Sequence, residues 1–247
     1  MKDEQLLRYS RHILLDGFDI AAQEKLLAST VFILGAGGLG CPAALYLAAS
    51  GVGHIILCDN DHVELSNLQR QIAHGTDDIA DAKTASLKRS LQAINPDIQI
   101  TCINQRMTAE SNTDIIQQAD VVLDCSDNFT IRFLLNRLCW HYKIPLVSGA
   151  AIRTQGQLAV FDFRQEGSPC YACLYSEDAS TGESCSENGV LSPLVGIIGS
   201  WQAAEAIKLL TGFGQALEAR LQAIDVHNNQ IQQWRIHKDS HCPVCQK

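Results

Sequence analysis

The stretch TVFILGAGGLGCPAALYLAASGVGHIILCD (30–59) decides the fold. Its opening residues (30–34) are apolar and rich in β-branched side chains, which predicts a buried strand. The glycine-rich turn GAGGLG (35–40) follows, and then come a helical stretch and a second strand over 54–59. A strand, a glycine turn, a helix and a strand within about 30 residues predict a βαβ unit, and a βαβ unit requires a parallel sheet.

The alternation of helices and strands continues up to residue 150. Further helices are predicted over 4–15, 82–94, 111–119 and 129–142, and further strands over 98–104, 120–126 and 144–150. Residues 156–163 then predict an antiparallel strand, and residues 219–237 predict a hairpin that turns at Asn228 and Asn229. We therefore predict the α/β class, with a Rossmann-like, mostly parallel sheet, helices on both of its faces and an antiparallel C-terminal extension.

One more helix, over residues 193–211, is predicted from the signals at its ends. Ser192 is a good N-cap, Pro193 suits the first helical position, and Gly212 can adopt the left-handed conformation that ends a helix. Neither an internal repeat nor a linker interrupts the chain. We therefore expect a single domain over residues 1–247.

The composition excludes several classes of protein. The chain has 247 residues, of which 46% are hydrophobic and 19% charged, and its net charge is −8. The apolar content argues against disorder, and the acidic balance argues against a nucleic-acid or membrane partner, since both need a basic patch. The N-terminus has no signal segment, and no apolar run reaches the roughly 18 residues of a membrane span. We expect a cytoplasmic protein with reduced cysteines.

The glycine turn and the acid after the second strand predict a nucleotide site. Gly35, Gly37, Gly38 and Gly40 form a GxGxxG pattern between a strand and a helix. Such a turn lets the backbone approach phosphates, and the helix N-terminus attracts negative charge. Asp59 ends the next strand, where its carboxylate can accept hydrogen bonds from ribose hydroxyls. The alternative is a structural glycine turn followed by a helix-capping aspartate.

Polar residues after the strand ends favour a triphosphate over a dinucleotide. They are Asp61, the string SNLQRQ (66–71), Lys83 and the pair Asp127-Asn128. Arg70 and Lys83 can neutralise phosphate oxygens, and Asp127 can hold Mg²⁺. Each of these residues alone has an ordinary surface explanation. Together they follow strand ends, and the ends of parallel strands meet at the edge where open α/β sheets bind ligands.

Four of the ten cysteines form two CxxC pairs, Cys170 with Cys173 and Cys242 with Cys245. Together they offer the four thiolates that Zn²⁺ prefers in structural sites, and we predict a zinc site that ties the C-terminal segment back to the body of the chain. A thioredoxin-like redox pair is the rival interpretation, but neither pair opens a helix after a first strand. A set of unliganded thiols is the third.

These segments resemble the ThiF/MoeB/HesA family, bacterial relatives of the ubiquitin-activating enzyme. The resemblance runs from Arg8 to Cys245, and it is carried by RYSR (8–11), GAGGLG (35–40), DND (59–61), SNLQRQ (66–71), DN (127–128), GAAIR (149–153) and the two CxxC pairs. The GAAIR segment and the length are most similar to the molybdopterin-synthase adenylyltransferase branch, MoeB. The segment RYSRHILLDG (8–17) is equally similar to the ThiF branch of the thiamine pathway.

The resemblance implies an ATP-dependent adenylyltransferase. Its substrate would be a small ubiquitin-fold sulfur-carrier protein that ends in Gly-Gly, either MoaD-like or ThiS-like. The C-terminal carboxylate of the carrier would attack the α-phosphate of ATP, form an acyl-adenylate and release pyrophosphate. No general base is needed, because a carboxylate is already ionised at pH 7. The implied pathway is molybdopterin biosynthesis, with the thiazole branch of thiamine synthesis as the alternative.

The same resemblance implies roles for individual residues. Asp59 would bind the ribose, and Asp127 would bind Mg²⁺. Asn67, Arg70 and Lys83 would contact the phosphates. The other residues expected at the ATP are Gly38, Asp61, Ser66, Leu68, Gln69 and Asn128. The nucleotide-binding part would span about residues 28–150, and the carrier-binding and zinc-clip part about residues 151–247.

Two residues far from these segments complete the implied catalytic set. Arg11 would reach into the site of a neighbouring subunit, which implies a homodimer. Cys185 stands alone in the polar stretch 175–190, which has neither helical nor strand periodicity. In some relatives a cysteine at the matching place bonds covalently to the carrier. Cys185 is therefore a candidate nucleophile, in a stretch expected to be accessible.

Two hypotheses from other classes compete with an adenylyltransferase. An NAD-dependent oxidoreductase would change the absorbance of its cofactor and would show no pyrophosphate exchange. A non-catalytic module would bind a ubiquitin-like partner without any need for ATP. The combination of Arg70, Lys83 and Asp127 argues against both, since neither needs that charge arrangement.

Overall fold

The computed structural model describes residues 1–109, 113–177 and 188–246. Its described strands form an eight-stranded sheet in the order β3-β2-β1-β4-β5-β6-β7-β8. The strands that pair in parallel are β1 (Thr30–Leu34), β2 (His54–Cys58), β3 (Gln99–Ile103), β4 (Val121–Asp124) and β5 (Leu146–Ile152). The strands β6 (Gln155–Phe161), β7 (Arg220–Asp225) and β8 (Gln230–Arg235) continue from β5 as antiparallel neighbours. The predicted sheet and its antiparallel C-terminal extension are confirmed.

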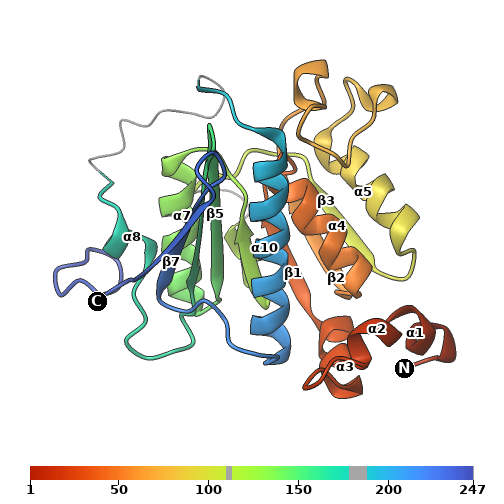
Figure 1. Ribbon diagram of the computed structural model, residues 1–247, viewed down its shortest axis with the longest axis horizontal. Coiled ribbons are helices and arrows are strands. Elements are labelled where there is room, and N and C mark those ends of the chain that lie inside the picture. The colour runs from red at the N-terminus through yellow and green to blue at the C-terminus, as the bar shows by residue number, and fades with distance from the viewer. Residues whose placement is uncertain (110–112, 178–187, 247) are drawn as a thin grey trace.

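Helices cover both faces of this sheet, as predicted (Figure 1). One face carries α4 (Gly40–Ser50), α5 (Lys83–Ile94) and α10 (Ser192–Thr211), and the other carries α7 (Phe129–Tyr142). Alternate residues of β1 serve the two cores: Val31 and Ile33 belong to the core with α4 and α10, whereas Phe32 and Leu34 belong to the core with α7. The shorter helical elements are α1 (Asp3–Arg8), α2 (Ser10–Ile13), α3 (Ile20–Ala28), η1 (Leu65–Asn67), η2 (Thr76–Asp78), α6 (Thr113–Ile116) and α8 (Tyr171–Leu174).

The N-terminal segment differs from the single helix predicted over 4–15. It forms two helices, α1 and α2, which meet at the buried Tyr9. The Tyr9 hydroxyl accepts a hydrogen bond of 2.9 Å from the Asn95 side chain, and its ring lies against the backbone of Gly51. These long-range contacts hold Tyr9 at the break between the two helices. The periodicity of the local sequence contains no information about them. The helix α3 was not predicted at all.

Two other helix predictions need correction at their ends. Ser192 is the first residue of α10 rather than its N-cap; Leu191 holds the cap position, and no side chain caps the helix. Gly212, with a φ of 79°, ends α10 as predicted. The short helix predicted over 111–119 is α6, which covers Thr113–Ile116, and residues 110–112 lie outside the described part of the chain.

The glycine turn after β1 depends on close backbone packing. Gly35 has a φ of +98°, and a Cβ at this residue would lie 2.7 Å from the carbonyl oxygen of Cys125, just after β4. A Cβ at Gly40 would lie 1.8 Å from the carbonyl oxygen of Gly35. Both positions therefore require glycine, and the turn packs tightly enough to bring the ends of β1 and β4 together.

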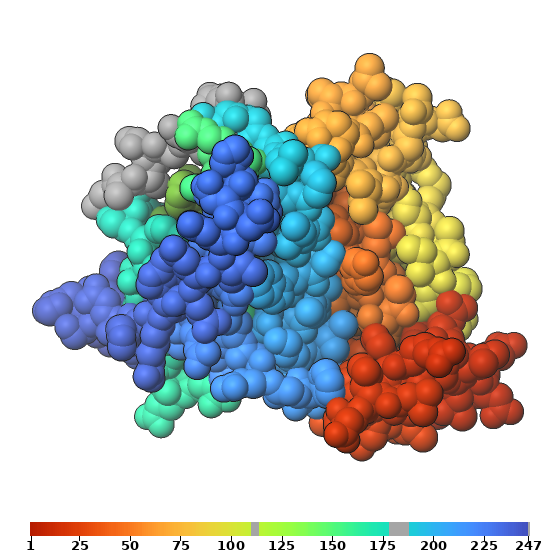
Figure 2. Space-filling view, in the orientation of Figure 1, coloured from red at the N-terminus to blue at the C-terminus, as the bar shows by residue number. Residues whose placement is uncertain are grey.

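The N-terminal ends of the parallel strands lie beside the helices α1 and α2 (Figure 1). There the Arg8 side chain donates a hydrogen bond of 3.0 Å to the carbonyl oxygen of Ile94. In the space-filling view, α10 and the β7–β8 hairpin cover much of the visible face (Figure 2). Within the described ranges, no helix has both the length and the apolar character needed to cross a bilayer.

Candidate active site

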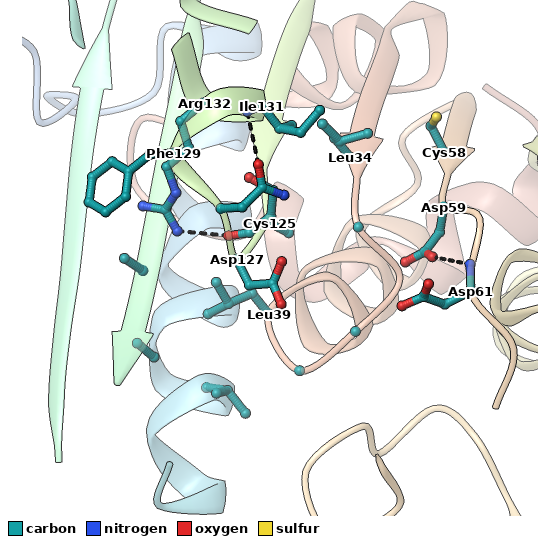
Figure 3. Close-up of a pocket in the computed structure, with 18 of the residues that line it drawn as sticks. Leu34, Leu39, Cys58, Asp59, Asp61, Cys125, Asp127, Phe129, Ile131 and Arg132 are labelled. Atoms are coloured by element: carbon teal, nitrogen blue, oxygen red, sulfur yellow. Dashed lines mark hydrogen bonds between the residues drawn. The ribbon is translucent and has the colours of Figure 1, made fainter. Parts of the chain in front are cut away.

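A cavity of about 670 Å³ lies at the carboxyl ends of the parallel strands. Its walls come from the glycine turn, the loops after β2 and β4, the first residue of α5, the first turn of α7, and strands β5 and β6. Figure 3 shows Asp59 and Asp61 on one side of it and Asp127, Phe129 and Arg132 on the other. This is the edge at which open α/β sheets bind their ligands.

Asp59 is held by the backbone on both of its carboxylate oxygens. Its Oδ2 accepts a hydrogen bond of 2.7 Å from the Ala36 N–H in the glycine turn, and its Oδ1 accepts one of 2.8 Å from the Asp61 N–H. The carboxylate therefore joins the end of β2 to the glycine turn. Each oxygen keeps a second lone pair, so a ribose hydroxyl can still donate to it.

Lys83 enters the cavity from the first residue of α5. Its ammonium lies 3.0 Å from Oδ2 of Asp61, and its side chain is 8% exposed against 60% for that of Asp61. A second contact joins the two residues, since the Lys83 N–H donates to the Asp61 carbonyl oxygen at 2.9 Å. The cation is thus held in a fixed place at the wall of the cavity, where it can face an anionic ligand.

The string SNLQRQ forms η1 and the turn that follows it, and only some of its residues face the cavity. Asn67, Arg70 and Gln71 line the cavity, whereas Ser66, Leu68 and Gln69 do not. The Arg70 guanidinium donates a hydrogen bond of 3.2 Å to the carbonyl oxygen of Ser66, its own segment's first residue. A hydrogen bond within the segment therefore holds the Arg70 side chain in place.

The loop after β4 brings Asp127 and Asn128 to the opposite wall, as predicted, and both line the cavity. Asn128 caps α7, because its Oδ1 accepts a hydrogen bond of 3.0 Å from the Ile131 N–H. The Arg132 guanidinium donates one of 2.7 Å to the carbonyl oxygen of Ser126 (Figure 3). The carboxylate of Asp127 thus projects from a loop that is fixed on both sides.

The far wall of the cavity was not predicted. It is formed by Phe129, Arg132, Gln157, Tyr171 and Tyr175. The Tyr175 hydroxyl donates a hydrogen bond of 2.6 Å to Oε1 of Gln157, and burial raises the pKa of Tyr175 above its ordinary value. Arg132 had one available signal, its place four residues after Asn128 on the same face of a helix. The tyrosines and Gln157 had none, because their strands and turns meet only in the folded chain.

Two predicted catalytic residues remain: Arg11, which the structure does not bring to the cavity, and Cys185. Arg11 belongs to α2, beside the N-terminal ends of the strands, and is absent from the residues lining this cavity. Cys185 lies outside the described residues. The remaining predicted residue, Gly38, lines the cavity, where a Cβ would come within 3.1–3.3 Å of the Val195 side chain of α10.

The four cysteines of the two CxxC pairs form one cluster. Their sulfur atoms all lie within 4.8 Å of one another, with 3.5 Å between Cys170 and Cys242, 3.4 Å between Cys173 and Cys245, and 4.0 Å between Cys170 and Cys173. Sulfur atoms bound at about 2.3 Å around a tetrahedral zinc would be roughly 3.8 Å apart. The spacing is far longer than a disulfide bond and fits a four-thiolate metal site.

A model of the ThiF family matches residues 9–244 of this sequence. The chain belongs to the ThiF family. It is 45% identical over 248 residues to the molybdopterin-synthase adenylyltransferase of Escherichia coli (strain K12), a match that covers 99% of this chain and 98% of that protein. It is 44% identical over 245 residues to the sulfur carrier protein ThiS adenylyltransferase of the same organism, with 99% and 97% covered.

Two further comparisons extend the ThiF family match. The adenylyltransferase and sulfurtransferase MOCS3 of Drosophila willistoni is 41% identical, and the match covers 99% of this chain and 54% of that protein. The crystal structure of E. coli MccB with ATP superposes with a TM-score of 0.85 at 24% identity, covering 97% of this chain and 75% of that chain, and it confirms the fold. The full-length relatives are adenylyltransferases, and this chain is one too. The oxidoreductase and binding-module hypotheses are set aside.

Proposed function

We propose that the chain activates the C-terminal carboxylate of a ubiquitin-fold sulfur-carrier protein as an acyl-adenylate, with release of pyrophosphate, in molybdopterin biosynthesis. The observation that carries the proposal is the cavity itself, in which Lys83, Arg70 and Asp127 converge from three different segments beside a glycine turn. The nearly full-length relatives with this function support the choice of substrate.

We infer the orientation of ATP from the residues that line the cavity. Its ribose lies at Asp59, the acid at the end of β2, and its phosphates follow the glycine turn and the N-terminus of α4 toward Arg70 and Lys83. Asp127, on the opposite wall, would hold Mg²⁺. In this arrangement the Lys83 ammonium, now 3.0 Å from Asp61, exchanges part of that contact for phosphate oxygens.

The chemistry then needs positioning and charge neutralisation rather than proton transfer. The carrier carboxylate is ionised at pH 7 and attacks the α-phosphorus, and the bond to the bridging oxygen of pyrophosphate breaks. Arg70 and Lys83 neutralise the charge that develops on the leaving pyrophosphate. The product has AMP as its leaving group, which a sulfur nucleophile can displace.

The wall that the sequence did not predict is where the carrier tail enters. Gln157 on β6 and Tyr175 line this part of the cavity and are joined by the hydrogen bond from the Tyr175 hydroxyl, so they offer the tail both an amide and an aromatic ring. A Gly-Gly tail has no side chains to obstruct its entry. Gln157, Tyr171 and Tyr175 of this wall belong to residues 151–247, which we assign to carrier binding and the zinc clip, whereas Phe129 and Arg132 belong to residues 28–150, which bind the nucleotide.

The four-cysteine cluster would hold a structural Zn²⁺. Its donor set and the 3.4–4.0 Å contacts between sulfur atoms support this assignment. The metal would join the turn at Cys170 and Cys173 to the C-terminal segment at Cys242 and Cys245. With all four positions taken by thiolates, it would have no open site for catalysis.

The assembly and the compartment are also proposals. Arg11 belongs to α2, which lies beside the N-terminal ends of the strands, and it does not line the cavity of its own chain (Figure 1). A contribution of Arg11 to ATP binding therefore requires a second copy, and we propose a homodimer. The nine described cysteines are all free, which suits the reducing cytoplasm.

The test is ATP–pyrophosphate exchange with purified carriers, each assayed alone. A MoaD-like carrier should support exchange that depends on Mg²⁺ and on the carrier's terminal glycine. A carrier truncated by that glycine is the matched control. Exchange with a ThiS-like carrier only would move the enzyme to the thiamine pathway, and exchange with neither would refute carrier adenylation.

A further inference from the structure

A buried histidine lies directly beneath the glycine turn. His74 is 7% exposed, and its Nε2 lies 3.0 Å from the carbonyl oxygen of Ala36 in that turn. On its other side, Nδ1 lies 2.7 Å from the hydroxyl of Ser86, which is itself 1% exposed in α5. Burial lowers the pKa of His74 from its ordinary value, so the ring is neutral at pH 7.

These two contacts fix which nitrogen carries the proton. A carbonyl oxygen only accepts hydrogen bonds, so Nε2 must be protonated to donate to Ala36. In a neutral ring Nδ1 is then an acceptor for the Ser86 hydroxyl, which can turn its single hydrogen to Nδ1 or to the carboxylate of Asp78. Both ring nitrogens are therefore used, each by a different element of the structure.

The imidazole joins three elements that face the nucleotide. Ala36 is held from both sides, because Asp59 accepts from its N–H at 2.7 Å while His74 donates to its carbonyl oxygen. Ser86 lies one helical turn after Lys83. The backbone N–H of His74 donates to the carbonyl oxygen of Gln71 at 3.1 Å, which continues the turn of the segment that carries Arg70.

We propose that His74 is a positioning residue for ATP binding, which holds the glycine turn in register with the Arg70 segment and with the start of α5. It makes no contact with the nucleotide itself. The inference rests on the proposed function only for the identity of the nucleotide. Its physical basis is that a buried, fully bonded polar group specifies one arrangement of the elements that it joins.

A cysteine–histidine nucleophilic pair is the rival interpretation of the same contacts. The Cys41 sulfur lies 3.6 Å from Nε2 of His74. However, Nε2 carries a proton and cannot accept the one from the thiol, and burial raises the pKa of Cys41 to about 12. The thiol is also fully buried, so no substrate reaches it. The pair is structural.

The test compares two amide replacements of the imidazole. In His74→Gln the longer side chain can place an N–H near the position of Nε2 and keep the bond to Ala36, whereas in His74→Asn the amide reaches only the position of Nδ1. We expect the Kd for a non-hydrolysable ATP analogue with Mg²⁺ to rise about tenfold in His74→Asn and less than threefold in His74→Gln. The KM for the carrier should stay within about twofold in both.

Ser86→Ala is a second variant, which removes the hydroxyl beside Nδ1 together with its hydrogen bond to Asp78. It should raise the Kd for the analogue by roughly two- to threefold. His141→Gln, at an exposed histidine in the last turn of α7, is the control and should change nothing. The proposal falls if His74→Asn and His74→Gln weaken nucleotide binding equally, or if only the melting temperature changes while the Kd of the folded variants does not.

A measurement on the wild-type protein tests the geometry without any enzymatic assay. Long-range proton–nitrogen correlation spectra of protein labelled with nitrogen-15 histidine should show a neutral His74 with its proton on Nε2. A proton on Nδ1 would break the link to Ala36 and refute the positioning role, even if pyrophosphate exchange is normal. A failure of exchange with this tautomer in place would count against carrier adenylation alone.

Discussion

The nucleotide edge of the sheet and the four-cysteine cluster both gather residues that are distant in sequence, but they do so by different means. At the nucleotide edge, the parallel strands β1, β2 and β4 all end at one side of the sheet, so Asp59 and Asp127 meet because of backbone topology. At the cluster, Cys242 and Cys245 follow β8 in a segment where the described residues form neither helix nor strand.

Because of this difference, we expect the side chains at the nucleotide edge to contribute mainly to ligand binding and those of the cluster to contribute mainly to the stability of the fold. The nucleotide edge is supported by the buried sheet, so its backbone arrangement persists when one side chain is removed. The cluster depends on the side chains themselves, since four sulfur atoms and a few apolar contacts hold the segment in place. Substitutions at the nucleotide edge should therefore reduce activity and spare stability, and those at the cluster should do the reverse.

The largest effect is expected for Asp127→Ala. Loss of a group that holds Mg²⁺ against the phosphates should slow pyrophosphate exchange by roughly 10²–10³-fold, or about 3–4 kcal/mol. Because Asp127 is exposed, the melting temperature should change by no more than about 2 °C. Asp77→Ala, an exposed aspartate outside the cavity, is the control. Exchange within about threefold of wild type would show that Asp127 holds no metal.

The reverse effect is expected for Cys242→Ser. Removing one of four ligands should release the zinc and destabilise the chain by about 2–3 kcal/mol, which corresponds to roughly 4–12 °C in a protein of this size. Below the new melting temperature, exchange should stay within about threefold of wild type. The measurements are metal content by mass spectrometry and thermal melting.

Cys102→Ser is the control for that experiment. Its sulfur lies outside the cluster and donates to the carbonyl oxygen of Thr84, a bond that a serine hydroxyl can keep. It should retain the metal and melt near the wild-type temperature. Wild-type protein that contains no zinc after purification in metal-free buffer, yet melts as cooperatively as zinc-loaded protein, would contradict the structural zinc site.

The two regions also differ in how far the sequence predicts them. The βαβ unit was predictable because β-branched runs, a glycine turn and Asp59 follow one another within 30 residues of chain. The cluster was predictable from two CxxC spacings alone. In both cases the residues that identify the feature lie close together in the sequence, as the βαβ segment or as a CxxC pair. The fold then only has to bring these short segments together.

The parts that sequence analysis missed depend on contacts between distant segments. Tyr9 breaks the N-terminal helix because Asn95, far along the chain, bonds to its hydroxyl. The far wall of the cavity combines Gln157 of β6 with Tyr175 after α8, and each looks ordinary in its own segment. Arg132 resembles a surface residue of an amphipathic helix until the loop after β4 packs against it.

A smaller, pH-dependent effect is expected at the border of the nucleotide half. Hydrogen bonds from the Gly75 N–H and from Arg89 lower the pKa of Asp78 to about 2. A carboxylate whose pKa is depressed on folding stabilises the protein above its unfolded pKa near 4, and that contribution is lost as the pH falls toward 2. Since Arg89 is half exposed, the contribution should be below about 1 kcal/mol.

Asp78→Asn tests this by thermal melting at two pH values. At pH 7 the variant should melt about 1–4 °C below wild type, and the gap should narrow as the pH approaches 3. Asp77→Asn next to it is the control. A gap that is independent of pH would mean that the side-chain hydrogen bond to Gly75 stabilises the turn, with no part for the charge.

The smallest effect on adenylation is expected at Cys185, which the described residues do not include. Formation of the acyl-adenylate uses ATP, Mg²⁺ and the carrier's carboxylate, and none of these steps needs a thiol. Cys185→Ala should therefore keep pyrophosphate exchange within about twofold of wild type, with Ser186→Ala as its control.

A later step differs, because a thiolate can attack the acyl-adenylate, form a thioester and expel AMP. Mass spectrometry of enzyme, carrier and Mg-ATP without reductant would detect that adduct. Loss of exchange in Cys185→Ala would mean that Cys185 takes part in adenylation at the nucleotide edge. It would contradict the assignment of adenylation and of the covalent step to different residues.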